Sequence, residues 1–344
     1  MISNNFSNHA YRPLISIILP VFNAGIYLRP CMDTLLNQTL REIEIICILD
    51  CPTDGSDKII EEYALKDNRV IIIRNEQNLS IGESRNVGLR IARGEYIGFS
   101  DHDDTHELDM YENLYSATEK GKKNIVFSGI LVESILNQEF PNYLNDISKK
   151  IYSLPLFHQI FYSLMPREGR KYRMHITPNL YRRGFIAEQH LSFVDTKSCF
   201  AEDKLFLLSA LSSIQHDEEI ALIPKKLYLY RLHENNAHLS NWYYDRDHVF
   251  SHLNYISDIV NKNTWIDKSI CMRILPVLQT SLLYSTFRHD CRQIGFFSIL
   301  KTYQSQLNSN ETLRKNVKST SIRIKGISIP KRFFLLWLKS ICRS

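Results

Sequence analysis

The stretch Gly94-Glu95-Tyr96-Ile97-Gly98-Phe99-Ser100-Asp101-His102-Asp103-Asp104 decides the fold of this chain. A short apolar run ends in three carboxylates, which indicates a buried strand that stops at a polar edge. Side chains alternate along a strand, so Asp101 and Asp103 are expected to face the same side there. Neighbouring carboxylates repel each other, and a divalent cation that carries a phosphate would remove that cost. The alternative is a solvated turn.

Further short apolar runs, rich in β-branched residues, predict buried strands at residues 15–21, 44–49, 70–74, 96–100 and 125–129. Segments with helical spacing of apolar residues separate them, around 27–36, 59–64 and 81–92. This alternation predicts an α/β fold with a mixed, mainly parallel sheet flanked by helices. Ligands of such sheets bind at the carboxyl ends of the strands. The loops expected there are 20–25, 50–56, 75–82 and 101–105.

The rest of the chain is less regular. A helix is predicted at 202–213, a strand with a break at Pro224 is predicted at 220–231, and mainly helical structure is predicted from Trp242 to about Leu307. We therefore divide the chain into an N-terminal tail, one α/β domain of two halves and a helical C-terminal region. The expected limits are 1–13, 14–240 (halves 14–130 and 131–240) and 241–344.

Composition places the chain among ordinary globular proteins, with 344 residues, 44% hydrophobic and 23% charged. Its seven cysteines are an odd number without a CxxC pair, which argues against a zinc site or a disulfide framework and for a reducing compartment. The first residues lack the pattern of a signal peptide, and no run approaches the ~20 apolar residues of a membrane span. We expect a cytoplasmic protein.

The net charge of +5 is concentrated at the C-terminus, where residues 308–344 hold nine basic residues and one acidic residue. Within this tail, residues 330–343 set large apolar side chains beside basic ones. Such a segment either lies on the inner face of the cell membrane as a peripheral anchor or packs on the protein as a terminal helix. The tail brings no nucleic-acid-binding motif with it, so no nucleic-acid partner is expected.

Six segments, taken in order, resemble motifs of the family 2 glycosyltransferases, which have the Rossmann-like, nucleotide-sugar-binding GT-A fold. They are Ile17-Ile18-Leu19-Pro20-Val21-Phe22-Asn23, Thr53-Asp54-Gly55-Ser56, Gly82-Glu83-Ser84-Arg85-Asn86-Val87-Gly88-Leu89, Asp101-His102-Asp103-Asp104, Ala201-Glu202-Asp203-Lys204-Leu205-Phe206 and Tyr230-Arg231-Leu232-His233. The resemblance covers roughly residues 14–240.

The resemblance implies a nucleotide-sugar donor and a divalent cation. Mg²⁺ and Mn²⁺ both suit carboxylate ligands. It makes Asp103 the main metal ligand and places Asp101 against the ribose and the metal shell. His233 would bind the metal or a phosphate. Asp104 has three possible roles: it assists the metal through water, caps a helix, or is a solvated carboxylate. His102 receives no role.

The same resemblance assigns the nucleotide pocket to Pro20, Phe22 and Asn23, with Phe22 against the base. Arg85 would donate its guanidinium fork to the diphosphate; the alternative is a surface arginine paired with an acid such as Glu83.

One position departs from the family pattern. Where the family shows paired aspartates that read uracil, this chain has Leu49-Asp50. Asp50 takes over that role only through a one-residue shift, which reverses the face of an extended segment. The resemblance nevertheless implies UDP.

On the acceptor side, the resemblance makes Asp203 the catalytic base and lets Glu202 orient the acceptor or its loop. Acids are also favoured in the first turn of a helix by its dipole alone. Arg182 and Arg183 would meet an anionic acceptor such as a lipid-linked phosphate, or are ordinary surface charges.

The activity implied is that of a metal-dependent, inverting glycosyltransferase that moves a hexose or related sugar to a growing glycan such as lipopolysaccharide or capsule. Two alternatives remain. A nucleotidyltransferase that makes sugar nucleotides would be expected to carry a glycine-rich, basic loop after its first strand, whereas residues 21–26 hold one glycine and no basic residue. The nearly complete motifs argue against a non-catalytic glycan-binding or assembly protein, for which Leu49 is the best support.

Overall fold

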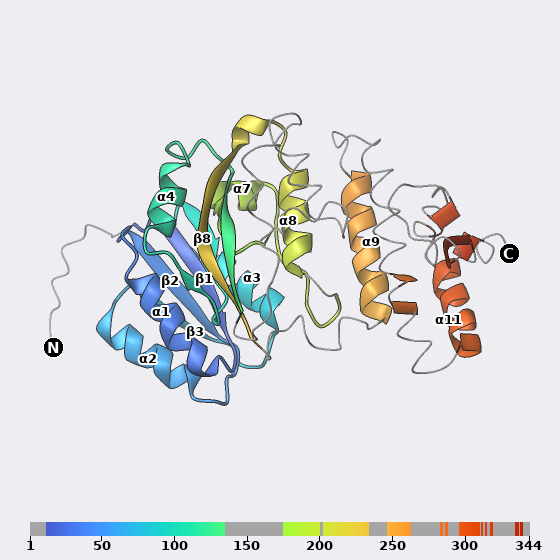
Figure 1. Cartoon of the computed structure of the whole chain (residues 1–344), viewed down its shortest axis with the longest axis horizontal. Coiled ribbons are helices and arrows are strands. Elements are labelled where there is room, and N and C mark those ends of the chain that lie inside the picture. Colours follow the sequence, from blue (N-terminus) through green and yellow to red (C-terminus); the bar gives the residue numbers. More distant parts are fainter. Residues whose placement is uncertain are drawn as a thin grey trace.

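The structure, a computed structural model, describes residues 12–134, 175–199, 202–233, 246–262 and 296–309, with the single positions 283, 284, 286, 287, 311, 314, 317, 318, 334–336, 338 and 339. An eight-stranded mixed sheet in the order β3-β2-β1-β4-β7-β6-β8-β5 forms its centre (Figure 1). The predicted α/β fold with a mixed sheet is therefore confirmed.

Half of the sheet is parallel. Its strands are β1 (Ile15–Val21), β2 (Ile43–Leu49), β3 (Val70–Arg74) and β4 (Tyr96–Phe99). Every residue of β1, β2 and β4 is buried, because helices cover both faces of the sheet. This double burial explains why these strands read as unbroken apolar runs. Parallel pairing of β1 with β2 and with β4 brings their carboxyl ends to one edge of the sheet.

The other half mixes directions. Its strands are β5 (Thr105–His106), β6 (Ile125–Ser134), β7 (Asn179–Arg182) and β8 (Ile220–Leu232). β7 runs antiparallel to β4 and β6, and β8 runs parallel to β6. The register of β6 on β8 shifts near Gly129, opposite the part of β8 that contains Pro224. A proline cannot donate to the ladder, which accounts for the break expected there.

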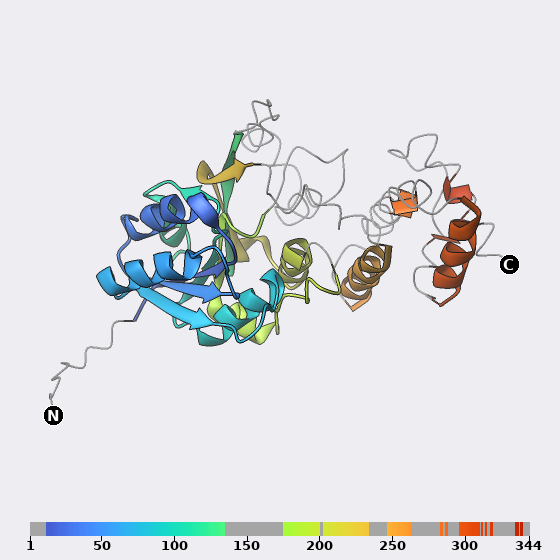
Figure 2. The same ribbon diagram turned by 90° about the horizontal axis from the view of Figure 1, so that it is seen from below.

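Helices cover both faces of the sheet. They are η1 (Gly25–Tyr27), α1 (Leu28–Leu36), α2 (Ser56–Lys66), α3 (Ile81–Ile91), α4 (Met110–Ser116), α7 (Arg183–Glu188), α8 (Glu202–Ser212) and η3 (Asp217–Glu219). α1, α2 and α4 pack on one face, and α3, α7 and α8 pack on the other, so the sheet separates two cores. Two further helices, α9 (Arg246–Lys262) and α11 (Phe296–Ser309), follow α8 away from the sheet (Figures 1 and 2).

The predicted elements agree closely with this architecture, except that β6 continues from the expected Gly129 to Ser134. α9 and α11 are the helices described in the region expected to be helical. The limit expected near residue 240 and the tail up to residue 11 lie outside the described residues, so the domain limits stay predictions. The cysteines whose state is described, Cys31, Cys47, Cys51 and Cys199, are free thiols.

Three apolar residues of the C-terminal tail, Phe334, Leu335 and Leu338, are buried. The Phe334 ring packs against Phe287 at 4.9 Å between centroids and against Tyr303 at 6.5 Å. Of the two roles expected for the tail, the described residues support packing on the protein; the rest of the tail lies outside them. Among the helices of the described ranges, none is long and apolar enough to cross a membrane.

Candidate active site

The acidic stretch after β4 forms a turn. The strand ends at Phe99, and the Asp104 amide donates to the Asp101 carbonyl at 3.3 Å. The expectation that strand alternation aligns Asp101 with Asp103 is therefore wrong, because the strand stops before both residues. The turn instead directs the two carboxylates to different partners, Arg85 and His233.

Asp103 and His233 meet across 130 positions of sequence. The His233 Nε2 lies 2.9 Å from Asp103 Oδ2. The imidazole is buried and stacks on the Tyr27 ring, with 4.3 Å between centroids. The Arg231 guanidinium also lies over the Tyr27 ring, 5.4 Å from its centroid. Two of the residues expected to bind a metal thus lie side by side.

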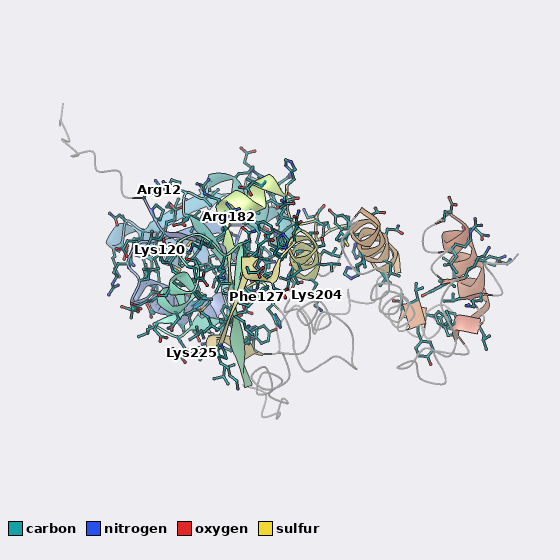
Figure 3. The ribbon with its side chains drawn as sticks, turned by 90° about the horizontal axis from the view of Figure 1, so that it is seen from above. Arg12, Lys120, Phe127, Arg182, Lys204 and Lys225 are labelled. Atoms are coloured by element: carbon teal, nitrogen blue, oxygen red, sulfur yellow. The ribbon has the colours of Figure 1, made fainter. Side chains whose placement is uncertain are left out.

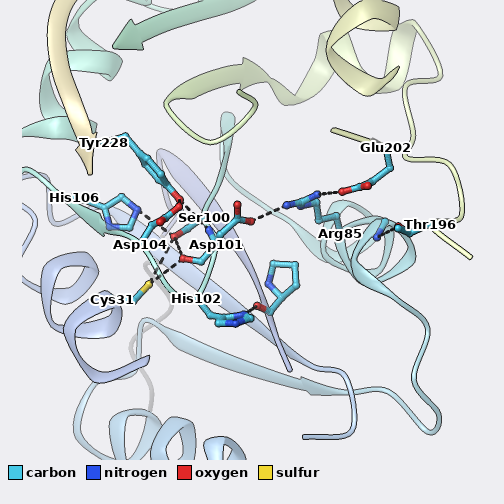
Figure 4. A network of polar contacts seen from close by, with 12 residues as sticks. Cys31, Arg85, Ser100, Asp101, His102, Asp104, His106, Thr196, Glu202 and Tyr228 are labelled. Atoms are coloured by element: carbon cyan, nitrogen blue, oxygen red, sulfur yellow. Dashed lines mark hydrogen bonds and ion pairs between the residues drawn. The ribbon is translucent and has the colours of Figure 1, made fainter. Parts of the chain in front are cut away.

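Asp104 holds this arrangement together. Its Oδ2 accepts from the Tyr228 hydroxyl at 2.6 Å (Figure 4). Its Oδ1 accepts from the Arg231 amide at 2.8 Å. The Tyr228 hydroxyl also accepts from the Asp101 amide at 3.2 Å. The side chain is fully buried and a strand, β5, follows it directly, so the alternatives of a solvated carboxylate and a helix cap are wrong. Burial, with the nearby charge of Asp103, raises the pKa of Asp104 well above its usual value.

Arg85 is buried, with 2% of its side chain exposed, so the surface alternative is wrong. One terminal nitrogen donates to Asp101 Oδ1 at 2.7 Å and the other to Glu202 Oε1 at 2.8 Å. Glu83, its expected alternative partner, instead accepts from Asn86. α3 therefore connects the acidic turn to the start of α8.

Glu202 and Asp203 occupy the first turn of α8, as expected. Burial and the neighbouring Asp203 charge raise the pKa of Glu202 to about 7, although Arg85 opposes the shift. Asp203 is only partly buried. The helix dipole explains why acids occur at this position. It does not explain the contact of Glu202 with Arg85, which connects Glu202 to the acidic turn.

The first loop of the expected nucleotide pocket lies beside this turn. Phe22 is 45% exposed, as a side chain that receives a base would be. The Pro20 carbonyl lies 3.2 Å from His102 Nδ1, so His102 contacts the last residues of β1, next to this loop. Asn23 Oδ1 accepts from the Thr53 amide at 2.8 Å and thereby joins the first loop to the second.

Asp50 is engaged within the chain. Its Oδ1 accepts from the Asn75 side chain at 2.7 Å and from the Leu79 amide at 2.8 Å, and its Oδ2 accepts from the Ser80 amide at 3.0 Å. These bonds fix the turn before α3. Leu49 is buried in the core, where it contributes packing. Contact of Asp50 with a base stays a prediction.

Three residues at this edge have backbone conformations that favour glycine. They are Asn23 (φ 46°), Cys51 (φ 59°) and Ser80 (φ 76°), in the loops after β1, after β2 and before α3. Such conformations cost on the order of 1–3 kcal/mol each and concentrate at functional sites. Their position at one edge supports a binding role for these loops.

Arg182 and Arg183 lie away from the site. Arg182 is paired with Tyr96, the first residue of β4, whereas the acidic turn follows the last. Its guanidinium bonds to Glu188 at 2.9 Å, and Arg183 donates to the Gly94 carbonyl at 2.7 Å. Figure 3 shows Arg182 toward the end of the sheet at which Arg12 leads into β1. The expected contact with an anionic acceptor is therefore wrong.

The residues present fit a divalent cation. Within the described part of the chain, no group of three or more His, Cys, Asp or Glu side chains is arranged to hold a metal. The Asp103–His233 pair nevertheless offers a carboxylate oxygen and an imidazole nitrogen, a donor set that suits Mn²⁺. Cations of this kind commonly take one or two protein ligands and complete their shell with substrate phosphates and water.

Sequence reasoning missed Tyr228 and His106, both buried beside the turn. His106 Nε2 lies 3.1 Å from Ser100 Oγ, and its Nδ1 lies 3.1 Å from Thr34 Oγ1. Tyr228 lies two positions before Tyr230 on β8, and residues two apart on a strand face the same side. The sequence could therefore have placed Tyr228 on the same face as Tyr230. No local signal marked His106.

Acidification is expected to lower the free energy of unfolding because His106 is buried in its neutral form. Desolvation lowers the pKa of His106 from 6.5 to about 3, so below pH 6.5 the unfolded chain binds the extra proton. The stabilisation by neutral His106 is present above pH 6.5 and decreases by up to about 2 kcal/mol between pH 7 and pH 5. Urea unfolding of wild type and His106→Gln at both pH values measures this. The difference in unfolding free energy between wild type and His106→Gln should be smaller at pH 5 than at pH 7. An equal difference at both pH values would contradict the prediction.

Comparison with known proteins agrees with this geometry. The model of "Glycosyl transferase family 2" matches residues 16–187. The "Uncharacterized glycosyltransferase EpsJ" of Bacillus subtilis is 33% identical over 225 residues, which cover 65% of this chain and 62% of EpsJ. The chain thus spans about three fifths of that relative's length.

Two solved structures share the fold. S. aureus TarS 1–349 in complex with UDP-GlcNAc has a TM-score of 0.66 and 19% identity, covering 95% of this chain and 88% of TarS 1–349. The mannosyltransferase PcManGT from Pyrobaculum calidifontis, in complex with GDP-Man and Mn²⁺, has a TM-score of 0.54 and 12% identity, covering 96% and 87%. These identities show the fold alone. Because the family model spans half of the chain and its motifs gather at one edge of the sheet, this protein belongs to glycosyl transferase family 2.

Proposed function

We propose that this protein is a metal-dependent, inverting glycosyltransferase that moves a sugar from a UDP-linked donor to a hydroxyl of a growing glycan. The contact of Asp103 with His233, beside Asp101, carries the proposal. The nucleotide sugars bound by TarS and PcManGT, and the Mn²⁺ of PcManGT, support it by analogy of fold.

Asp103 and His233 would hold the cation, with Asp101 beside them. When bound, the cation would supply positive charge to the diphosphate as it leaves. Phe22 and the loops after β1 and β2 would receive the base and ribose. Asp50 would act on the nucleotide through the turn that it fixes.

Asp203 would serve as the base. As the acceptor hydroxyl attacks the anomeric carbon, a new C–O bond forms, the bond to the diphosphate breaks, and the proton of the hydroxyl passes to Asp203. Attack from the face opposite the leaving group inverts the anomeric configuration. Glu202, fixed by Arg85, would keep the start of α8 in place.

We also propose a lipid-linked glycan as acceptor, of the kind used for lipopolysaccharide or capsule, and a cytoplasmic location at the inner face of the cell membrane. Contact with the membrane would use the basic residues of 308–344, because Phe334, Leu335 and Leu338 are buried. Anionic headgroups attract such residues.

A donor panel tests the function. UDP-, GDP- and dTDP-sugars are incubated with glycan acceptors and with Mn²⁺, Mg²⁺ or a chelator, and released nucleotide is measured. UDP-sugar turnover that the chelator abolishes is expected. Formation of a sugar nucleotide from a nucleoside triphosphate and a sugar phosphate would reveal a nucleotidyltransferase instead. Nucleotide binding without turnover of any donor would reveal a non-catalytic protein.

A further inference from the structure

Arg85 joins the two halves of the candidate site through one buried guanidinium. Its contacts reach Asp101, 16 positions away on the acidic turn, and Glu202, 117 positions away on α8 (Figure 4). The distances of 2.7 and 2.8 Å are those of charge-assisted hydrogen bonds. A single side chain thus sets how far the start of α8 lies from the turn.

These contacts commit both terminal nitrogens of the guanidinium to carboxylates of the protein. The remaining nitrogen, Nε, is buried without a hydrogen-bond partner among the described residues. The plane of the group lies near the Phe193 ring, 5.3 Å from its centroid. An arginine that recognises a diphosphate presents its fork of donors to it. Here each terminal nitrogen instead donates to a different protein carboxylate.

The neighbours of Arg85 on α3 hold the helix in place on two sides. The Asn86 side chain donates to the Phe193 carbonyl at 2.9 Å and accepts from the Phe193 amide at 2.8 Å. Gly88 packs against β1, where an added Cβ would lie 2.5 Å from an Ile18 methyl carbon. α3 is therefore a fixed support between the sheet and the segment that precedes α8.

We propose that Arg85 is a positioning residue: it fixes Asp101 relative to Glu202, and through Glu202 it places Asp203 opposite the donor. Asp203 directly follows Glu202 in the first turn of α8, so a fixed Glu202 carboxylate fixes the backbone from which Asp203 projects. The inference rests on the proposed function for the roles of Asp203 and Asp101. It replaces the expectation that Arg85 binds the diphosphate.

The test separates positioning from phosphate binding. For wild type, Arg85→Gln and Arg85→Lys, the kcat of transfer and the dissociation constants of UDP and uridine are measured with Mn²⁺ present. Misplacement of the base is expected to lower kcat by about 100-fold. The preference for UDP over uridine should stay within about threefold of wild type, because the phosphates lose no partner. A preference reduced more than about tenfold would overturn the proposal.

A second measurement asks whether Arg85 acts through Glu202. If it does, the double variant Arg85→Gln/Glu202→Gln has a kcat close to that of the slower single variant, since both changes break the same link. Multiplicative losses would contradict the proposal. Arg93→Gln is the matched control: Arg93 pairs with the buried Glu44 at 2.6 Å on the opposite edge of the sheet, so its loss should leave kcat unchanged.

The outcome also distinguishes failure of the inference from failure of the function. If wild type transfers no sugar from any donor, the proposed function fails, while the UDP and uridine affinities still report whether Arg85 binds phosphate. Arg85→Lys keeps the charge and reaches only one carboxylate, so it covers the case in which Arg85→Gln does not fold. Circular dichroism of each variant checks folding.

Discussion

Replacing Asp103 with alanine is expected to lower the rate of sugar transfer by about 10³-fold. The substitution removes the carboxylate that lies 2.9 Å from His233 Nε2, and with it the stronger of the two ligands proposed for the cation. Without that ligand the cation is held less tightly, so less positive charge offsets the negative charge that develops on the leaving diphosphate. Steady-state kinetics with a UDP-sugar donor and Mn²⁺ measure the loss.

Mn²⁺ binding, followed by electron paramagnetic resonance, should weaken in the same variant whether or not a donor is present. His233→Gln should weaken it as well. Asp109→Ala removes an aspartate at the N-terminal end of α4 and should behave as wild type. Unchanged transfer by Asp103→Ala would reject the metal role, and unchanged Mn²⁺ binding would place the cation elsewhere.

Replacing Asp203 with asparagine is expected to lower kcat by about 10²–10⁴-fold while the donor binds as in wild type. Asparagine keeps the shape of the side chain but does not accept the proton of the acceptor hydroxyl. Because Arg85 holds Glu202 and not Asp203, the start of α8 should keep its place. Donor affinity by calorimetry and kcat at saturating donor separate the two effects.

Asp57→Asn is the matched control, since Asp57 occupies the first turn of α2 as Asp203 occupies that of α8. It removes the same charge from a helix start and should leave kcat unchanged. Weaker donor binding by Asp203→Asn would reject its role as the base. Rescue of the variant's rate by a small external base such as azide or formate would support it.

The sequence was a good guide to the sheet. β1, β2 and β4 are buried on both faces, so β-branched residues fill them without interruption and their ends are sharp. The loops at their carboxyl ends followed from the parallel order, because such strands end at one edge. The pairing of Asp103 with His233 followed from the resemblance, since no local pattern connects residues 130 positions apart.

Burial of polar groups was beyond the reach of the sequence. Asp104 and Arg85 were expected at least in part as solvated charges, and both are buried because Tyr228, Asp101 and Glu202 supply their partners. Tyr228 lies on β8 and Glu202 lies on α8, and the distance of both elements from the turn depends on the packing of the whole sheet. The contact of Arg182 with the acceptor, suggested by the resemblance, is also wrong, because the antiparallel direction of β7 carries this residue to the opposite edge.

The left-handed backbone of Ser80, described above, has a consequence for engineering. The hydrogen bond from its amide to Asp50 and the contact of its hydroxyl with Asp195 at 3.3 Å help to hold this serine in a conformation natural to glycine. Glycine there would relieve the torsional cost and raise thermal tolerance, yet it would free the turn that leads into α3. Thermal stability therefore favours glycine at this position, whereas a fixed turn beside the donor pocket favours serine.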